Sequence, residues 1–318
     1  MSETKYPDSG YEAPPEQEEQ GGGGMSGTRI LVIALVAIAV IALCALGAFF
    51  IVQLVSGPDA TPTAIVVTSP PTGVPATVDT RARIQAAGKI VVGTSADYPP
   101  FEYRPSDYQI DGFDIALMDE IGRRLGIQVE YKNFAFDGLG GALQLGQVDA
   151  VIAAVSVSPE REAVVDFSDI YLVGSDGLIA QADASVGSIT SPEQVADSRV
   201  GAQRGSVYES WLQSSLVDAG LMPPGNLFAY EKAEDAVRDL RENRLDLVVL
   251  DLQPAEASVE QGGVKLVGQG LNQQRYGIAF QKGADSLRVQ VNQALTDLHN
   301  EGYIAQLAKD YLDLDQVP

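Results

Sequence analysis

Residues 89–132 decide the fold class: KIVVGTSADYPPFEYRPSDYQIDGFDIALMDEIGRRLGIQVEYK. The β-branched run at 89–94 is typical of a strand. Residues 113–125 carry apolar side chains at the spacing of one helix face, and QVEYK at 128–132 has the composition of a second strand. The residues on that helix face are Ile115, Met118, Ile121 and Leu125. A strand, a helix and a strand in succession predict an α/β fold with parallel strands.

The alternation continues along the rest of the chain. Strands are predicted within 149–156, 198–206, 226–230, 245–251 and 275–280, and helices at 207–216, 232–244, 285–301 and 303–312. The pattern passes through two cycles without sequence identity between them, which predicts two α/β lobes. In open α/β sheets a ligand binds beyond the carboxyl ends of the strands, so residues at those ends are the candidates for a site.

Composition excludes several classes of function. Lys and Arg number 21 against 43 Asp and Glu, and the net charge of -22 repels nucleic acid and anionic lipid surfaces. We therefore expect no nucleic-acid partner. Cys44 is the only cysteine and His299 the only histidine. A catalytic cysteine, a thiolate or histidine-rich metal site and a Ser-His-Asp triad are not expected, and no cofactor is predicted.

The first 82 residues differ in composition from a folded domain. Residues 1–28 are acidic and rich in Pro and Gly, which predicts a disordered tail. Residues 29–55 contain an uncharged apolar run of about 26 residues, Ile30 to Val55, where roughly 20 suffice to cross a bilayer as a helix. This run predicts a transmembrane anchor. Residues 56–82, rich in Pro and Thr, are predicted to form an extended linker.

Two other interpretations of the apolar run are weaker. A cleaved signal peptide usually has an apolar core of about 7 to 15 residues nearer the start of the chain. Acylation of Cys44, as in a lipoprotein, is disfavoured by Leu43, because signal peptidases require a small residue there. Arg29 directly before the run favours an N-terminus inside the cell and a globular part outside the cytoplasm.

The sequence SPER at 158–161 is a candidate anion site. Ser158 is a typical N-cap, and Arg161 then lies in the first turn of a helix. A cation there opposes the helix dipole, and an anion shared by the guanidinium and the free backbone N–H groups would explain its position. A carboxylate suits the planar guanidinium, which can donate two parallel hydrogen bonds. An ion pair of this arginine with Glu160, Asp166 or Asp169 remains an equally open explanation.

The second lobe offers two further candidates. Gln203 to Val207 links a predicted strand to a predicted helix, with Ser206 as N-cap and Gly205 allowing a close approach of the backbone. Asp251 ends an apolar strand and could hold an ammonium group, although an ordinary helix cap is an equally open alternative. An anion site on one lobe and a carboxylate on the other would suit a zwitterion in a cleft.

Several segments occur in an order and spacing that resemble a known family. They are GTSADYPPFEY, GFDIALMDEIGRRLGIQVEY, FAFDGLGGALQLGQVDAVIAAVSVSPERE, VDFSDIYLVGSDGLIA, VGAQRGSVYE and RYGIAFQKG. Over roughly Arg83 to Leu312 the chain resembles the polar amino-acid-binding proteins of bacterial ABC transporters, family 3. The resemblance implies a periplasmic-binding-protein type II fold, with two α/β lobes joined by two hinge strands. Lobe 1 would then comprise 83–178 and 276–318, and lobe 2 would comprise 179–275.

The resemblance also implies a set of ligand-binding residues from both lobes. They are Ser95, Tyr98, Phe136, Ala154, Ser156, Arg161, Gln203, Ser206, Val207 and Asp251. Arg161 and Ser156 would hold the α-carboxylate of an amino acid, with the backbone N–H groups of Ser206 and Val207 assisting.

The remaining roles concern the ammonium group and the side chain of the ligand. Asp251 and the carbonyl of Ala154 would hold the α-ammonium group. Tyr98 and Phe136 would enclose the side chain as an aromatic pair, although the sequence pattern alone favours core aromatics at both positions.

The ligand side chain is expected to be uncharged. Ser95 stands where related proteins that bind basic or amide side chains often carry Asp, so that carboxylate is missing here. Val207 lacks the hydroxyl common at its position, and Leu250 and Gln203 bring no charge.

These features predict a membrane-anchored, extracytoplasmic binding protein of an ABC import system. It would capture a free amino acid between closing lobes and then dock on a permease. A sensory receptor module is one alternative, but only about 28 residues precede the apolar run as a cytoplasmic part. A cyclohexadienyl dehydratase-like enzyme on the same fold is the other, with Asp251 and Glu102 as the possible general acids. The chain is expected not to be an enzyme.

Overall fold

The computed structural model describes residues 80–107 and 109–315. The predicted tail, the predicted transmembrane anchor and most of the predicted linker lie outside the described residues. Within the described part of the chain, no helix is both long enough and apolar enough to span a bilayer. Helix α2 (Thr80–Ala87) includes the last three residues of the range predicted as linker, so the first lobe begins earlier than expected.

Lobe 1 is built on a five-stranded sheet in the order β4-β1-β5-β12-β6. The strands are β1 (Lys89–Thr94), β4 (Gln128–Asn133), β5 (Ala150–Val151), β6 (Val165–Phe167) and β12 (Ala279–Gln281). β1 pairs in parallel with β4 and β5, whereas β12 pairs antiparallel with β5 and β6. The sheet is therefore mixed and not purely parallel as predicted, because β12 belongs to the segment that returns from lobe 2.

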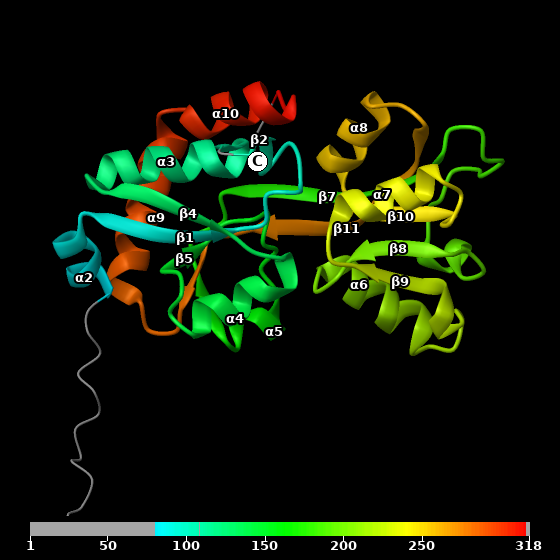
Figure 1. Ribbon diagram of the computed structural model, residues 1–318, viewed down its shortest axis with the longest axis horizontal. Helices are drawn as coiled ribbons and strands as arrows, with labels where there is room; N and C mark the ends of the chain where they lie inside the picture. The colour runs from blue at the N-terminus through cyan, green and yellow to red at the C-terminus, as the bar shows by residue number, and fades with distance from the viewer. Residues whose placement is uncertain (1–79, 108, 316–318) are drawn as a thin grey trace, which may run out of the picture. The chain divides into compact units, whose positions relative to one another are not determined.

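Helices cover both faces of the lobe 1 sheet (Figure 1). On one face α3 (Phe113–Leu125), α9 (Asp285–Asn300) and α10 (Tyr303–Leu312) form an apolar core with strand residues that include Ile90 and Val92. On the other face a second apolar cluster joins α4 (Leu139–Gln144) to β5, β6 and β12. The short elements are η1 (Phe136–Gly138), α5 (Pro159–Glu162) and the hairpin of β2 (Tyr103–Ser106) and β3 (Gln109–Asp111).

Lobe 2 contains the sheet β11-β7-β10-β8-β9. Its elements are β7 (Leu172–Gln181), η2 (Pro192–Val195), β8 (Val200–Gln203), α6 (Val207–Leu212), η3 (Gln213–Val217), η4 (Pro224–Asn226), β9 (Leu227–Tyr230), α7 (Ala233–Arg241), β10 (Leu247–Asp251), α8 (Leu252–Glu260) and β11 (Val264–Tyr276). Every residue of β10 is buried, since α6 packs on one face of the sheet and α7 and α8 pack on the other. A nearly continuous apolar run is typical of such a central strand.

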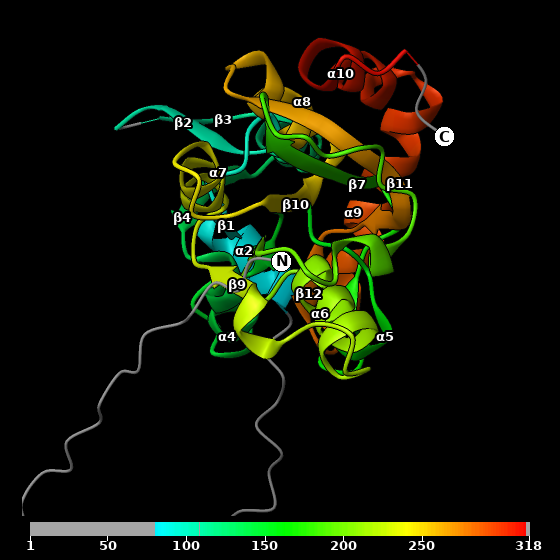
Figure 2. The same ribbon diagram turned by 90° about the vertical axis from the view of Figure 1, so that its right-hand side faces the viewer.

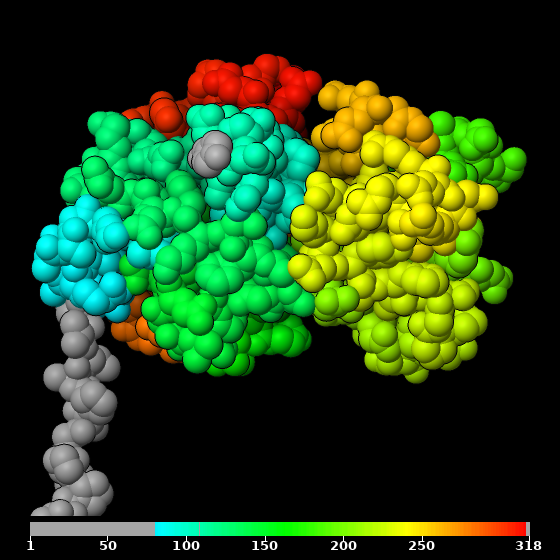
Figure 3. All heavy atoms as spheres, viewed as in Figure 1, coloured from blue at the N-terminus to red at the C-terminus, as the bar shows by residue number. Residues whose placement is uncertain are grey.

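Two long strands connect the lobes. β7 and β11 pair antiparallel from Leu172 opposite Tyr276 to Gln181 opposite Val264, and they lie side by side in both ribbon views (Figure 2). The chain passes between the two sheets at 168–171 and at 277–278. The boundary proposed between residues 178 and 179 therefore falls inside β7. A furrow separates the surfaces of the two lobes in the space-filling view (Figure 3).

The strand predicted within 149–156 is much shorter than expected, since only residues 150–151 are in β5. Ala154 has φ of 43°, in the left-handed region, and this ends the extended conformation. The predicted helix at 303–312 is confirmed at both ends, and the one at 285–301 ends one residue earlier than predicted.

Candidate functional site

A small cavity between the lobes collects most of the residues predicted for the ligand site. Its free volume is about 20 Å³, which is room for about one water molecule. It is lined by Tyr98, Phe136, Ala153, Ala154, Ser156 and Arg161 from lobe 1, and by Gln203, Ser206, Val207, Tyr208, Val249 and Asp251 from lobe 2. The structure thus brings together every predicted site residue except Ser95.

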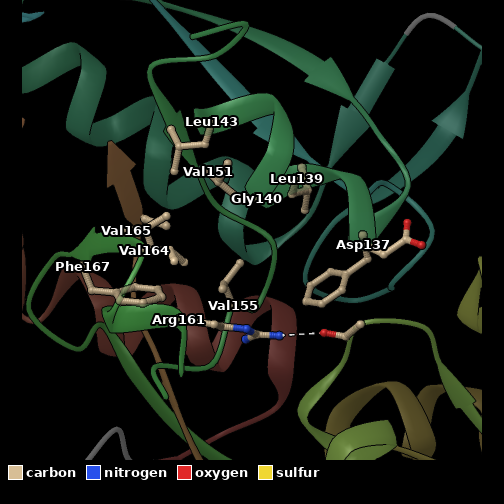
Figure 4. A pocket seen from close by; sticks show the side chains of 13 residues that line it. Asp137, Leu139, Gly140, Leu143, Val151, Val155, Arg161, Val164, Val165 and Phe167 are labelled. Atoms are coloured by element: carbon tan, nitrogen blue, oxygen red, sulfur yellow. Dashed lines mark hydrogen bonds between the residues drawn. The ribbon is translucent and has the colours of Figure 1, made fainter. Parts of the chain in front are cut away.

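Arg161 reaches across the boundary between the lobes. Ser158 is the N-cap of α5, as predicted, and its hydroxyl accepts a hydrogen bond from the backbone N–H of Arg161 at 3.4 Å. Guanidinium Nη1 donates to the carbonyl of Ser156 at 2.7 Å. Nη2 donates to the carbonyl of Gly205 in lobe 2 at 3.0 Å, the bond drawn as a dashed line in Figure 4. The guanidinium carbon also lies 5.5 Å from the ring centroid of Phe136, within range of a cation–π contact.

No carboxylate oxygen lies within ion-pair distance of this guanidinium in the described part of the chain, although the charges of Asp251 and Glu160 act on it from further away. The predicted alternative, an ion pair with Glu160, Asp166 or Asp169, is absent there, and Asp166 pairs with Lys282 instead. Burial lowers the pKa of Arg161, which reflects the loss of water around the cation. A half-buried guanidinium whose hydrogen bonds go to carbonyl oxygens is electrostatically suited to an anion.

Asp251 faces the same cavity from lobe 2. It occupies the N-cap position of α8, but its side chain makes no capping hydrogen bond. The hydroxyl of Tyr98 donates to Oδ2 at 2.9 Å, and the hydroxyls of Tyr208 and Tyr276 both donate to Oδ1. The backbone N–H of Asp251 in turn donates to the Tyr98 hydroxyl at 2.8 Å. The helix-cap explanation of this residue is therefore wrong.

Burial controls the protonation of this carboxylate and its partners. Burial raises the pKa of Asp251, while the three tyrosine hydroxyls act to lower it. The pKa values of Tyr98, Tyr208 and Tyr276 are raised well above the usual value, by burial and by the charge of Asp251. The hydroxyls therefore stay protonated and remain hydrogen-bond donors to the carboxylate.

The strand-to-helix turn of lobe 2 has the predicted N-cap. The Ser206 hydroxyl accepts from the N–H of Glu209 at 3.2 Å. Its own N–H donates to the carbonyl of Gln203 at 3.1 Å, so the role predicted for this N–H toward a ligand carboxylate would require it to leave that carbonyl. A Cβ on Gly205 would lie 3.0 Å from the Cβ of Asp137 in lobe 1, which explains the glycine. Nε2 of Gln203 is buried without a hydrogen-bond partner among the residues that the structure describes.

Ser95 lies outside the central cavity. Its hydroxyl donates to Oδ1 of Asp97 at 2.9 Å, and both residues line a neighbouring cavity of about 400 Å³. Oδ2 of Asp97 accepts from the N–H of Ala233, which belongs to lobe 2. Burial raises the pKa of Asp97 to about 6. Ser95 is therefore not part of the central cavity, its contact with the ligand stays a prediction, and a carboxylate is present two residues further along.

Asp114 and Glu102 are two buried carboxyl groups, and Asp114 holds Ala154, a lining residue of the central cavity, in place. Oδ2 of Asp114 accepts from the N–H of Ala154 at 2.7 Å and from the hydroxyl of Tyr171 at 3.1 Å, which holds Ala154 in its left-handed conformation. Burial raises the pKa of Asp114 to about 7. Burial and the nearby Asp114 raise the pKa of Glu102 well above its usual value. Glu102 does not line the cavity, so it is not placed as a general acid there.

Tyr208 and Tyr276, which hold Asp251, were not predicted from the sequence, and neither were the lining residues Ala153 and Val249. Tyr208 is the second residue of α6, directly after Val207, and Tyr276 is the last residue of β11. A tyrosine at either position would be taken for an ordinary core aromatic, and no spacing signal marks their contact with Asp251.

Comparison with known proteins decides the family. The model of the bacterial extracellular solute-binding proteins, family 3, matches residues 90–314, well over half of the chain. The chain belongs to this family. This family 3 solute-binding protein is 25% identical over 236 residues to the L-cystine-binding protein TcyJ of Escherichia coli strain K12. The matched region covers 73% of this chain and 86% of that protein.

Solved structures of relatives agree with the observed fold. An ancestral arginine-binding protein bound to arginine is 34% identical, with a TM-score of 0.66 over 70% of this chain and 98% of that one. The same kind of ancestral protein has also been solved bound to glutamine, with a TM-score of 0.65. An ancestral amino-acid-binding protein described as a precursor of cyclohexadienyl dehydratase is 28% identical, with a TM-score of 0.66 over 73% of this chain and 99% of that one. The family 3 chain therefore has a periplasmic-binding-protein-like α/β fold.

Proposed function

We propose that this chain is the amino-acid-binding component of an ABC import system and that it binds one free amino acid between its lobes. One observation carries the proposal: Arg161 from lobe 1 and Asp251 from lobe 2 line the same cavity. The first is a cation without a carboxylate partner among the described residues, and the second is a carboxylate that meets only neutral hydroxyls. Opposite charges on opposite lobes match the carboxylate and the ammonium group of a zwitterion.

Two further observations support this assignment of the ends of the ligand. The carboxylate would take the donors of Arg161 that now meet the carbonyls of Ser156 and Gly205. The buried Nε2 of Gln203 would gain the acceptor that it lacks. The ammonium group would approach Oδ2 of Asp251, the oxygen that has a single tyrosine partner.

Binding requires movement of the lobes, because a cavity of about 20 Å³ is too small for an amino acid. The two strands β7 and β11 provide the hinge on which the lobes separate. Tyr98 must leave Asp251 for the ammonium group to enter. The ligand then contacts both lobes, which favours the closed form over the open one by the free energy of those contacts. Closed lobes would dock on the permease.

The proposed ligand has an uncharged side chain. Apart from Arg161 and Asp251, the lining of the central cavity consists of neutral residues, and Tyr98 and Phe136 bring aromatic rings to it. Asp97 is one candidate partner for a basic side chain, but its two oxygens already accept from Ser95 and Ala233 in the neighbouring cavity. A third charge on the ligand would therefore have no partner in the central cavity.

The proposal includes the place of the protein in the cell. The apolar run from Ile30 to Val55 would anchor the chain in the membrane, with the two lobes outside the cytoplasm. The Pro- and Thr-rich segment 56–82 would keep the binding domain near its permease.

A thermal-shift screen of the purified full-length protein against the twenty amino acids tests this function. At least one neutral amino acid should raise the melting temperature, because a ligand that binds only the folded state stabilises it. Arginine and lysine should raise it less. If none of the twenty amino acids changes the melting temperature, the proposal is wrong; a larger shift with arginine than with every neutral amino acid contradicts the uncharged side chain.

A further inference from the structure

A second cavity, of about 190 Å³, lies in lobe 1 between α4 and the strands β5, β6 and β12 (Figure 4). It shares Phe136 and Arg161 with the central cavity. Its lining is almost entirely apolar: Phe136, Leu139, Gly140, Leu143, Val151, Val155, Val164, Val165, Phe167 and Ala279, with Asp137, Arg161 and Gly205 at the boundary with lobe 2.

Small residues on two facing surfaces create this space. On the helix side the lining residues recur at positions 136, 139, 140 and 143, which lie on one face of η1 and α4. On the sheet side Ala279 lies between Val151 and Phe167 in the registers of three adjacent strands. A Cβ on Gly140 would meet no atom within 4 Å. Because Gly140 has no side chain and Ala279 has a small one, neither residue fills the cavity.

The charge at this cavity favours an anion. Arg161 lies at its edge and extends toward lobe 2, as Figure 4 shows, and among residues 80–107 and 109–315 it forms no ion pair with a carboxylate. The only acidic residue of the lining, Asp137, lies 3.9 Å from the guanidinium of Arg204 and is partly neutralised by it. The cavity thus combines apolar walls with one guanidinium that forms no ion pair with a carboxylate among the described residues.

We propose that this lobe 1 cavity binds a small monocarboxylate with an apolar tail of about five to seven carbons. The tail would lie between α4 and the sheet, and the carboxylate would accept hydrogen bonds from Arg161. The size fits, since an apolar cavity of about 150 Å³ takes up a benzene molecule. Because the amino acid of the proposed function needs the same guanidinium, the two ligands should exclude one another. An apolar carboxylate would then act as a competitive regulator of amino-acid capture.

Hexanoate is the probe, with acetate and hexan-1-ol as matched controls, in calorimetric titrations of the full-length protein. Each buried methylene contributes a factor of about four to affinity, and hexanoate has four more methylenes than acetate, so it should bind about 250-fold more tightly. Hexan-1-ol lacks the charge and should bind about tenfold more weakly than hexanoate. The proposal is overturned if hexanoate does not bind, or if it binds no more tightly than acetate.

Two glycines of α4 provide a matched pair of variants. Gly140 and Gly141 are both exposed, and a Cβ on either meets no atom within 4 Å, but only Gly140 lines the cavity. Gly140→Leu should fill the space and weaken hexanoate binding at least tenfold, while amino-acid binding stays within about threefold of the original. Gly141→Leu should change neither. Equal hexanoate affinity in the two variants would exclude this cavity as the site.

The outcomes separate this proposal from the proposed function. Hexanoate binding that depends on Gly140, in a protein that binds no amino acid, would refute only the amino-acid function. Amino-acid binding without hexanoate binding would refute only the apolar site. Simultaneous binding of both ligands, seen as an unchanged amino-acid affinity in saturating hexanoate, would refute the shared use of Arg161.

Discussion

The substitution Tyr98→Phe tests how the lobes are held together. The hydroxyl of Tyr98 is the centre of a contact between lobe 1 and lobe 2, because it donates to Oδ2 of Asp251 and accepts from the backbone N–H of the same residue. Phenylalanine keeps the ring and its packing against Phe101 but removes both hydrogen bonds. We therefore expect the lobes of the variant to separate more readily when no ligand is added.

The size of the effect follows from the two bonds. A hydrogen bond to a charged group contributes about 1.5 to 3 kcal/mol, and a buried N–H left without an acceptor costs about 1 to 3 kcal/mol. In the open form the carboxylate and the backbone N–H of Asp251 can both hydrogen-bond to water, so losing the Tyr98 hydroxyl destabilises the closed form alone. A total of about 3 kcal/mol shifts the equilibrium between closed and open lobes by a factor of roughly 150.

Distances between spin labels can measure this equilibrium. Leu145 in lobe 1 and Leu221 in lobe 2 are exposed, at 75% and 50%, so cysteine can replace each of them in a Cys44→Ser background. Tyr98→Phe should broaden the distance distribution and lengthen its mean. Tyr131→Phe is the matched control, since the hydroxyl of Tyr131 bonds only within lobe 1, to Asp119 and Ile115. An unchanged distribution in Tyr98→Phe would refute the reasoning.

Three more predictions concern the ammonium site, pH and the anchor. Asp251→Asn should weaken amino-acid binding at least 100-fold in calorimetry, because the buried ammonium group of the ligand loses its counter-charge. Asp239→Asn is the control and should leave binding unchanged, since Asp239 accepts a hydrogen bond from Tyr230 elsewhere in lobe 2. A loss of affinity below tenfold in Asp251→Asn contradicts the role of Asp251. The pKa of Asp114 is raised to about 7, so in the folded state this group holds a proton that the unfolded state releases, and Asp114 alone should lower stability by up to about 1.4 kcal/mol per pH unit as pH rises from about 4 to 7. Urea unfolding at pH 5, 6 and 7 should show this slope, and Asp114→Asn should flatten it; an equal slope in both proteins refutes the assignment. The full-length chain should remain in the membrane pellet when membranes are washed with alkaline carbonate. Leu43→Arg places a charge in the apolar run and should release part of the protein to the supernatant. Release of the unaltered chain would contradict the predicted anchor.

Much of the fold could be predicted from local patterns. The helix face predicted at 113–125 is the buried face of α3, and the apolar run before Asp251 forms β10 with every residue buried. Patterns of this kind are local, since side chains alternate on a strand and recur on a helix face whatever the rest of the chain does. The direction of β12 is not local, because it depends on where the chain returns after lobe 2.

Conformations that tertiary contacts impose were not predicted. Ala154 has a left-handed backbone that its own side chain does not favour, and the carboxylate of Asp114, forty residues earlier, accepts its N–H. The strand predicted through this position is therefore cut short. Nothing in the neighbouring sequence signals such a contact.

At the site, too, features set by neighbouring residues were predicted, whereas contacts between residues far apart in the sequence were not. The N-caps Ser158 and Ser206 follow from local residue types, and both are confirmed. The three tyrosines around Asp251 lie 153, 43 and 25 positions from it in the sequence, so their hydrogen bonds depend on the folded arrangement of both lobes. The grouping of the predicted ligand residues came from the resemblance to a family and not from their spacing.

A calorimetric titration of Arg161→Ala tests the central claim most directly. The ligand is the amino acid that gives the largest thermal shift, and the protein is the full-length chain with and without the substitution. The unaltered protein should bind one amino acid per chain, and Arg161→Ala should show no measurable binding, because the α-carboxylate would be desolvated without its charged partner. An Arg161→Ala protein that binds the amino acid with the original dissociation constant would contradict the account.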